Sequence, residues 1–375
     1  MAKSLGPRQV NMTRYLTVFA STLLVSAALV LTQRWHGRYS LDECVGVQKH
    51  HVTPTPRIGG IAIVAGLVTG WFLTAHEVHE MLGAMLLAGL PAFAFGLLED
   101  VTKQVSVQVR LLATMFSGVL AWHFTGVAMQ DTGVPAIDWL LSYLPLAVLF
   151  TAFAVGGVAN AINIIDGFNG LAAGSVAIML SAMGLIALSL GDTPLAMVSF
   201  LLVACALGFG ALNWPLGKLF LGDGGAYLLG FLVAWVAVLL PMRHVEVHAW
   251  ATILVCAYPV LEVGFSVHRR RKRVGHHPGQ PDKVHLHHLI HRRIVCKYLP
   301  GLSPELKNGL TSPLCWLATA LPAAWAVAFA QNNLMLATGF CVLIFIYAAL
   351  YARLTQFRWC FSARTLNPVI TTAAL

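Results

Sequence analysis

Long apolar runs separated by short polar loops dominate this chain. Eleven such runs occur, at residues 15–31, 58–74, 81–98, 111–127, 139–158, 171–190, 196–212, 226–240, 249–265, 316–330 and 334–351. About 20 apolar residues cross a bilayer as a helix, and only helices or closed barrels satisfy the backbone there. Because the runs show no strand-like alternation, the pattern predicts an all-α integral membrane protein. We expect a polytopic bundle of about 11 transmembrane helices, with 10 as the alternative because several runs are short.

The composition agrees with this fold class. Of 375 residues, 58% are hydrophobic and 10% charged, whereas soluble domains carry about 25% charged residues. The longest polar stretch, residues 266–312, is too short and too basic to bury a core of its own. We therefore expect a single membrane domain over residues 1–375, with 266–312 as a basic cytosolic loop. The seven cysteines form no Cys-x-x-Cys pair, so neither a disulfide framework nor a zinc ribbon is indicated.

The basic residues are distributed asymmetrically between the loops. Eleven spans place 20 of the 24 Lys and Arg residues on the side of the C-terminus, Arg243 on the other side, and Lys3, Arg8 and Arg14 on an N-terminal tail that lies with Arg243. The positive-inside rule makes the basic side cytosolic. The net charge of +9 follows from these loops, which attract anionic lipid headgroups. No aromatic-interleaved basic domain accompanies the charge, and nucleic-acid binding is not expected.

Carboxylates and amides gather at the cytosolic ends of the runs. Glu99 and Asp100 end the third run, where they could hold a cation or simply be a solvated terminus. Asn160, Asn163 and Asp166 are three residues apart, which places them on one face of a helix in an otherwise apolar stretch. Asn169 and Asp223 stand just before later runs; each could cap a helix, and Asp223 also offers the hard oxygen that Mg²⁺ prefers.

Basic side chains and imidazoles complete the polar set. His285, His287 and His288 follow Lys283 in the large basic loop, a combination that suits an anionic diphosphate. A zinc site built on His287 and His291, or a plain surface cluster, are the alternatives. Lys49 and Arg57 flank a Pro-rich loop before Gly59-Gly60, which could contact phosphate or be an ordinary basic turn. Lys218 lies shortly before Asp223.

Taken together and in this order, the motifs resemble those of the polyprenyl-phosphate N-acetylhexosamine-1-phosphate transferases, glycosyltransferase family 4. The motifs are Asn160-Ala-Ile-Asn-Ile-Ile-Asp-Gly-Phe-Asn-Gly-Leu-Ala, Phe220-Leu-Gly-Asp-Gly-Gly and His285-Leu-His-His. The Pro54–Gly60 and Pro281–His288 segments look more like the undecaprenyl-phosphate N-acetylglucosamine-1-phosphate transferase branch than like the phospho-MurNAc-pentapeptide translocases.

The resemblance implies an Mg²⁺-dependent reaction, with Mn²⁺ as an alternative ion. A polyprenyl phosphate attacks the β-phosphorus of a UDP-sugar, giving polyprenyl-diphosphate-sugar and UMP, at the start of O-antigen, capsule or related envelope glycan synthesis. The implied metal ligands are Asp223 and Asp100. The expected catalytic residues are Glu99, Asp100, Asn163, Asp166, His285, His287 and His288, and the expected substrate-binding residues are Lys49, Arg57, Asn160, Asn169, Lys218 and Lys283.

The chain departs from the family pattern at three positions. Glu99 and Glu262 stand where Asp is usual, and Asn169 replaces a usual Asp. All three side chains stay polar, and we expect an active enzyme with its site on the cytosolic face of a bacterial inner membrane. A homodimer is compatible with this expectation. The rivals are a muramyl-pentapeptide translocase and a transporter, although a transporter would place polar residues near mid-span and show inverted repeats.

Overall fold

The computed structural model describes residues 12–42, 54–271 and 284–356. The described chain is helical apart from β1 (Leu41–Asp42) and β2 (Thr55–Pro56), which pair antiparallel with Leu41 opposite Pro56. The helices are α1 (Met12–Leu31), α2 (Gln33–Ser40), α3 (Gly60–Leu73), α4 (His76–Thr102), α5 (Val107–Thr125), α6 (Pro135–Leu141), α7 (Leu144–Ile165), α8 (Leu171–Ser189), α9 (Thr193–Asn213), α10 (Gly222–Arg243), α11 (Ala249–Val255), α12 (Ala257–Arg271), α13 (Leu286–Ile290), the π-helical turn η1 (His291–Val295), α14 (Cys296–Tyr298), α15 (Pro304–Phe329) and α16 (Asn333–Thr355).

The predicted fold class is confirmed, since all eleven apolar runs are helical, although 139–158 is divided between α6 and α7 and 249–265 between α11 and α12. Within the described residues, eight helices are long and apolar enough to cross a membrane, and the bent pair α11–α12 would make a ninth. The apolar helix α3 is shorter, at 14 residues, and α5 is not among the eight. The chain is therefore a multi-pass membrane protein, and the count of about 11 spans stays a prediction.

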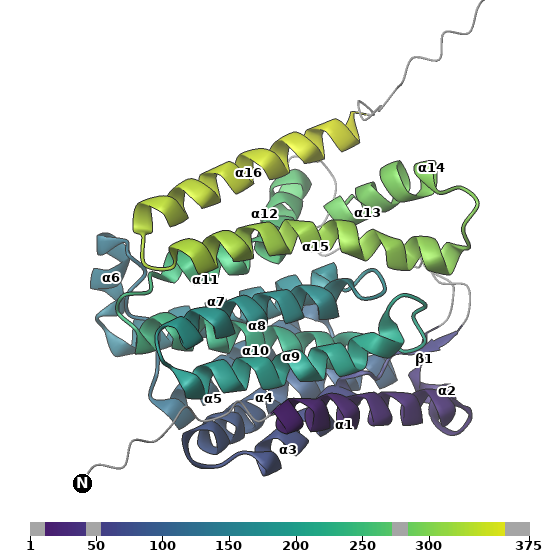
Figure 1. Cartoon of the computed structure of the whole chain (residues 1–375), viewed down its shortest axis with the longest axis horizontal. Helices are drawn as coiled ribbons and strands as arrows, with labels where there is room; N and C mark the ends of the chain where they lie inside the picture. Colours follow the sequence, from purple (N-terminus) through teal and green to yellow (C-terminus); the bar gives the residue numbers. More distant parts are fainter. Residues whose placement is uncertain (1–11, 43–53, 272–283, 357–375) are drawn as a thin grey trace, which may run out of the picture.

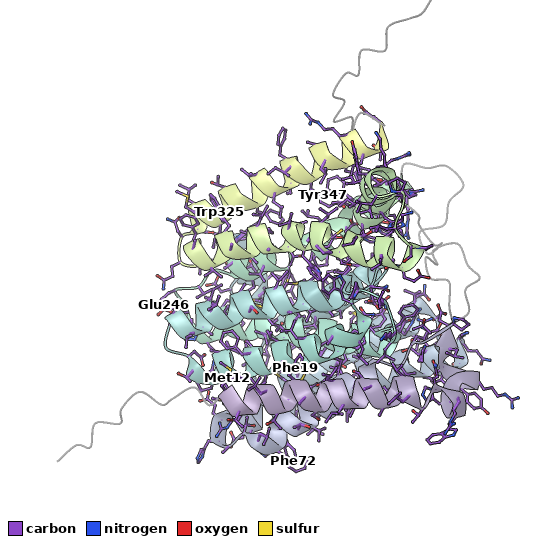
Figure 2. The ribbon with its side chains drawn as sticks, turned by 45° about the vertical axis from the view of Figure 1, so that its right-hand side comes forward. Met12, Phe19, Phe72, Glu246, Trp325 and Tyr347 are labelled. Carbon is purple, nitrogen blue, oxygen red and sulfur yellow. The ribbon has the colours of Figure 1, made fainter. Side chains whose placement is uncertain are left out.

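The long helices lie side by side, and most of them run across the view in Figure 1. One end of the bundle, on the right of Figure 1, carries α2, β1, α13 and α14; we call it the site end, and the other the far end. Large apolar side chains cover the outside, among them Phe72 and Met12, which are 71% and 62% exposed (Figure 2). Such a surface is expected where the neighbouring medium is lipid rather than water.

Helix α10 forms the centre of the bundle. All of its residues from Gly222 to Pro241 are buried, and it packs mainly against α4 and α7. The crossing with α4 is close because both helices carry glycine there: a Cβ added to Gly96 would lie 2.6 Å from the backbone nitrogen of Gly224. The central helix therefore begins at the site end with Asp223 in its first turn.

Two segments differ from the sequence-based expectation. The run 249–265 is broken into α11 and α12, which meet at 76°. Pro259 has no backbone N–H, and its ring clashes with the carbonyl four residues earlier, at Val255, where α11 ends. The described residues of the expected loop 266–312 are mostly helical, since α12 continues to Arg271, α13 to α14 cover Leu286–Tyr298 and α15 begins at Pro304. Hydropathy marked only the apolar core of these helices, whose polar ends continue beyond it.

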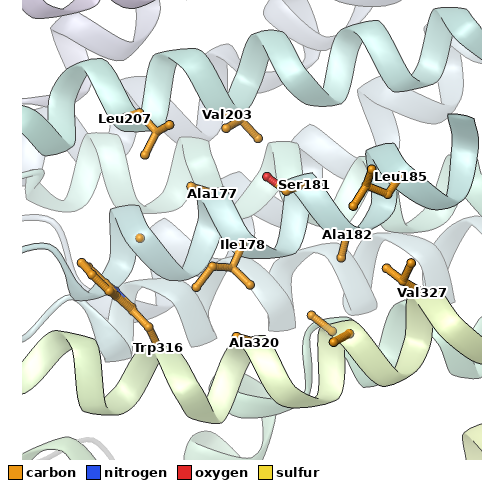
Figure 3. A pocket seen from close by; sticks show the side chains of 13 residues that line it. Ala177, Ile178, Ser181, Ala182, Leu185, Val203, Leu207, Trp316, Ala320 and Val327 are labelled. Atoms are coloured by element: carbon orange, nitrogen blue, oxygen red, sulfur yellow. The ribbon is translucent and has the colours of Figure 1, made fainter.

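A lateral groove follows α8 between α9 and α15, away from the polar residues of the site end. Small residues on α8 form its floor, and the groove encloses about 450 Å³ (Figure 3). Its lining includes Gly174, Ala177 and Ser181 of α8, Val203 and Leu207 of α9, and Trp316, Ala320 and Val327 of α15.

Candidate active site

The start of α10 is held by a carboxylate from α4. Asp100, only 1% exposed, accepts hydrogen bonds from the backbone N–H groups of Asp223 at 2.8 Å and Gly224 at 2.9 Å. The first N–H groups of a helix have no partner within the helix, and a carboxylate there also interacts favourably with the helix dipole. Asp100 thus caps α10 from a neighbouring helix and fixes the position of Asp223.

The two members of the predicted acidic pair face different surroundings. The Glu99 carboxylate accepts a hydrogen bond from the Val105 N–H at 2.7 Å, in the turn between α4 and α5. Successive residues on a helix point about 100° apart, so Glu99 and Asp100 do not share one environment. The structure brings Asp100 to Asp223, and it places Glu99 at the helix end.

Three side chains from separate segments converge on the carboxylate of Asp223. Arg57, just before α3, lies 3.0 Å from it through Nη2, and Asn163 of α7 donates to it at 3.1 Å. Arg110, from the first turn of α5, forms a salt bridge with the other carboxylate oxygen. Arg57 also reaches Asp100 through Nε at 3.1 Å. We call Arg57, Asp100, Arg110, Asn163 and Asp223 the Asp223 cluster.

Arg110 was not among the residues selected from the sequence. Its guanidinium also lies 5.8 Å from the ring centroid of Tyr227, and the Tyr227 hydroxyl donates to Asn160 at 3.3 Å. Asn160 is thereby linked to the cluster. The only sequence signal for Arg110 is a positive charge at the start of a span, which the positive-inside rule explains equally well.

The turn between α7 and α8 carries Asp166 at the C-terminal end of α7. Burial raises the pKa of Asp166 to about 7, and the positive charge of Arg57 opposes that rise. Gly167 follows, and a Cβ there would lie 3.5 Å from Nε2 of His287. The Asp166 turn and the histidine motif are therefore neighbours, although they lie far apart in the sequence.

The histidine motif starts α13 and is buried. His285, His287 and His288 are 4%, 0% and 5% exposed, which excludes a plain surface cluster. The rings of His285 and His287 stack at 5.2 Å with an interplanar angle of 8°. Phe168, from the Asp166 turn, packs edge-on against His287 at 5.8 Å. Glu262 of α12 binds His285 Nδ1 at 2.9 Å.

The structure gives the zinc alternative no support in the part of the chain that it describes. His291 pairs with Thr311 at 2.9 Å and with the Cys296 sulfur at 3.4 Å. Among the described residues, no group of three His, Cys, Asp or Glu side chains could hold a metal ion. Asp282, which precedes the histidine motif and could offer a further carboxylate, lies outside those residues.

The remaining predicted substrate-binding residues are dispersed. Asn169 is 7% exposed; its side chain donates to the Pro215 carbonyl at 3.0 Å, and its backbone N–H donates to Asn308 of α15 at 2.8 Å. It does not cap α8, whose N-cap is Gly170. Lys218 is exposed at the site end, and Lys49 and Lys283 lie outside the described residues.

The donor set of the Asp223 cluster fits a magnesium ion held mainly by substrate. Both oxygens of Asp100 accept backbone N–H groups, which are fixed by α10, whereas the partners of Asp223 are the side chains of Arg57, Arg110 and Asn163, which can rotate. Asp223 is therefore the better placed carboxylate. Mg²⁺ is commonly bound by one or two protein carboxylates together with substrate phosphates. The arrangement therefore fits one protein carboxylate better than two.

Comparisons with known proteins identify the family of the chain. The family model described as glycosyl transferase family 4 matches residues 82–241, a range that contains Asp100, Asn163 and Asp223. A probable undecaprenyl-phosphate N-acetylglucosaminyl 1-phosphate transferase of Bacillus subtilis is 30% identical over 281 residues, covering 72% of this chain and 77% of the relative. An undecaprenyl-phosphate α-N-acetylglucosaminyl 1-phosphate transferase of Yersinia pestis is 28% identical over 250 residues, 65% of this chain and 68% of the relative. The chain belongs to glycosyl transferase family 4, in the branch of these relatives.

Proposed function

We propose that the protein transfers a sugar 1-phosphate, most simply N-acetylglucosamine 1-phosphate, from a UDP-sugar to undecaprenyl phosphate. An oxygen of the lipid phosphate bonds to the β-phosphorus of the donor, the bond from that phosphorus to the bridging oxygen breaks, and UMP leaves with that oxygen. The products are undecaprenyl-diphosphate-sugar and UMP. The observation that carries the proposal is the convergence of Arg57, Arg110 and Asn163 on Asp223 at one end of a membrane bundle.

The Asp223 cluster suits phosphoryl transfer because this chemistry depends mainly on positioning and charge. The substrates are both anionic and repel each other, and two guanidiniums within one cluster offset that repulsion. Mg²⁺, bound by Asp223 and the donor phosphates, would supply Lewis-acid stabilisation of the charge on the transferred group. Asp100 acts by holding Asp223 in place.

The histidine motif and the Asp166 turn form the second half of the proposed site. Imidazole N–H groups donate to phosphate oxygens, and the motif adjoins the Asp166 turn at Gly167. The raised pKa of Asp166, about 7, suits a group that would take up a proton near neutral pH. In this proposal the histidines hold the diphosphate, and Asp166 lies beside the lipid phosphate that must react in its ionised form.

One face of α7 offers a path for the lipid chain. Leu149 and Phe153 are 60% and 66% exposed, and a Cβ on Gly157 would meet nothing within 4 Å. These residues and Asn160 recur every three or four positions, so they share one side of the helix. We propose that the acceptor tail lies in lipid along this face while its phosphate reaches Asn160 and Asn163.

The charge distribution supports a cytosolic site. The site end carries Arg57, Arg110 and Lys218. The N-terminal helix α1 begins at the far end, where Arg14 contacts Met197 at the start of α9, so Arg14 is an exception to the charge asymmetry. Under the positive-inside rule the site end would face the cytosol of a bacterial inner membrane. Such a site would draw its UDP-sugar from the cytosol and would start O-antigen, capsule or related glycan synthesis.

Turnover with a panel of donors tests the proposal. Purified protein with undecaprenyl phosphate and Mg²⁺ should release UMP from UDP-N-acetylglucosamine or a related UDP-N-acetylhexosamine. Release from UDP-MurNAc-pentapeptide alone would establish the cell-wall translocase activity instead. No release from any donor, together with lipid or solute movement across proteoliposomes, would favour a transporter. Omitting Mg²⁺ and adding Mn²⁺ in parallel tests the metal.

A further inference from the structure

Glu262 of α12 is a buried carboxylate that contacts the histidine motif. Its side chain is 1% exposed. One oxygen, Oε2, lies 2.9 Å from Nδ1 of His285, and the other, Oε1, accepts the Leu286 N–H at 2.8 Å. Oε1 also lies 4.0 Å from Nδ1 of His287. Burying a carboxylate lowers the stability of the fold unless its oxygens are hydrogen-bonded. These contacts therefore fix the position of the histidine motif relative to Glu262.

The helix that carries the motif depends on this contact. Helix α13 continues without a break through η1 and α14 to Tyr298, but an isolated helical segment this short is only marginally stable in water. By accepting the Leu286 N–H, Glu262 satisfies one of the first orphan donors of α13. By binding His285 at the same time, it fixes both the backbone and the first imidazole of the motif.

The contact also selects the tautomer of His285. A carboxylate accepts hydrogen bonds, so Nδ1 of His285 must carry the proton, and Nε2 stays on the opposite edge of the ring. The stacked ring of His287 has a similar orientation. Its Nδ1 lies 3.5 Å from the Tyr258 hydroxyl, and its Nε2 faces Gly167. The Nδ1 edge of His287 is thus turned toward α12, and its Nε2 edge toward the Asp166 turn.

We infer that Glu262 is a positioning residue, which acts through His285 to present the histidine motif to the donor diphosphate. The inference rests on the proposed function in one respect, the identity of the group that the histidines contact. Carboxylates that orient a metal-binding imidazole in this way typically change affinity or activity by about 10- to 100-fold when removed, and we expect a loss of that order here.

A double-mutant cycle tests the route through His285. Glu262→Gln should lower kcat/KM for the UDP-sugar by about 10- to 100-fold, and Glu262→Asp, which keeps a carboxylate, should recover part of that loss. The double variant Glu262→Gln/His285→Asn should be within about 2-fold of His285→Asn alone. Losses that multiply, or a Glu262→Asp variant no better than Glu262→Gln, would overturn the inference. Glu246→Gln, an exposed change at the far end (Figure 2), is the matched control and should keep wild-type turnover.

A second measurement does not depend on turnover. In ¹⁵N-histidine-labelled full-length protein, the His285 signals are identified by their loss in His285→Asn, and they should show a proton on Nδ1. In Glu262→Gln the amide oxygen must take the Leu286 N–H, so the amide NH₂ faces Nδ1 and the proton moves to Nε2. An unchanged Nδ1–H signal in Glu262→Gln would overturn the inference. If the wild type released no UMP from any donor, the proposed function would fail while this readout still decided the role of Glu262.

Discussion

At the scale of single residues, two carboxylates of the site end have separate tasks. Both oxygens of Asp100 accept hydrogen bonds from the N–H groups that begin α10. Asp223 faces two guanidiniums and an amide, the surroundings in which a phosphate or a metal ion would be exchanged. Asp100, by capping α10, therefore fixes the position of Asp223, which is itself buried at 8% exposure.

Replacing Asp223 by Asn should lower UMP release by on the order of 100-fold or more, because charge stabilisation by a bound metal ion is worth several kcal/mol. Steady-state turnover at saturating Mg²⁺ measures the effect. Asp138→Asn is the matched control: Asp138 lies on α6 at the far end and accepts the Thr132 N–H at 2.7 Å. Normal turnover in Asp223→Asn would remove the metal assignment.

The sequence marked as candidate site residues the polar side chains that interrupt apolar segments. It did not mark a basic residue at the end of a span, where basic residues are common in any membrane protein. Asn163 and Asp223 stand out in apolar or glycine-rich surroundings and were selected. Arg110 sits where any membrane protein has a basic residue, so nothing in the sequence separated it from an orientation signal. The different surroundings of Glu99 and Asp100 also required the structure, since adjacency in sequence hides the 100° between them.

At the scale of helices, glycines set how closely the neighbours approach the start of α10. A Cβ on Gly60 of α3 would lie 2.5 Å from the Gly225 nitrogen, and one on Gly96 of α4 would lie 2.6 Å from the Gly224 nitrogen. Small residues at such crossings allow membrane helices to pack backbone against backbone. These two contacts bring Arg57 and Asp100 to Asp223.

Gly96→Ala should therefore destabilise the protein, because the new methyl group meets backbone atoms that cannot rotate away. Overpacking of this kind costs about 1–3 kcal/mol, and the shift of α4 should also reduce turnover. Thermal unfolding in detergent and UMP release would show both effects. Gly157→Ala makes the same change in another membrane helix, α7, with nothing within 4 Å of the added Cβ. Equal stability of the two variants would contradict the close crossing.

Hydropathy predicted where the helices lie but not their ends or bends. The bend between α11 and α12 brings Glu262 to the start of α13. In the sequence, Pro259 is the residue that indicates this bend. The polar continuations, such as Ser266–Arg271 of α12 and Pro304–Ser312 of α15, carry no apolar periodicity. Their helical form follows from contacts with the rest of the bundle, which single-sequence patterns do not contain.

At the scale of the whole molecule, the far end of the bundle also carries a cluster of ion pairs. Arg243, at the end of α10, binds Asp192 at 2.6 Å and Glu77 at 2.8 Å, and His244 binds Asp192 at 2.9 Å. Asp192 also caps α9 through the Leu195 N–H at 3.0 Å. The cluster ties α4, α9 and α10 together at the end opposite to Asp223, so it should contribute to stability without touching substrate.

The contribution of this cluster should depend on pH. Burial raises the pKa of Asp192, but hydrogen bonds from Arg243, the Leu195 N–H and His244 outweigh it, and the pKa is lowered from the ordinary 3.8. A carboxyl with a lowered pKa stabilises the folded state above its unfolded pKa, and the stabilisation is lost as the pH falls through the folded value. Asp192→Asn should thus have a lower melting temperature than the wild type at pH 6 to 7, and the gap should close as the pH falls from about 4 toward 3. Asp131→Asn, at an exposed aspartate that accepts only the nearby Gly133 N–H at 2.9 Å, should follow the wild type throughout. A gap that stayed constant down to pH 3 would mean that the shape of Asp192, and not its charge, holds the far end together.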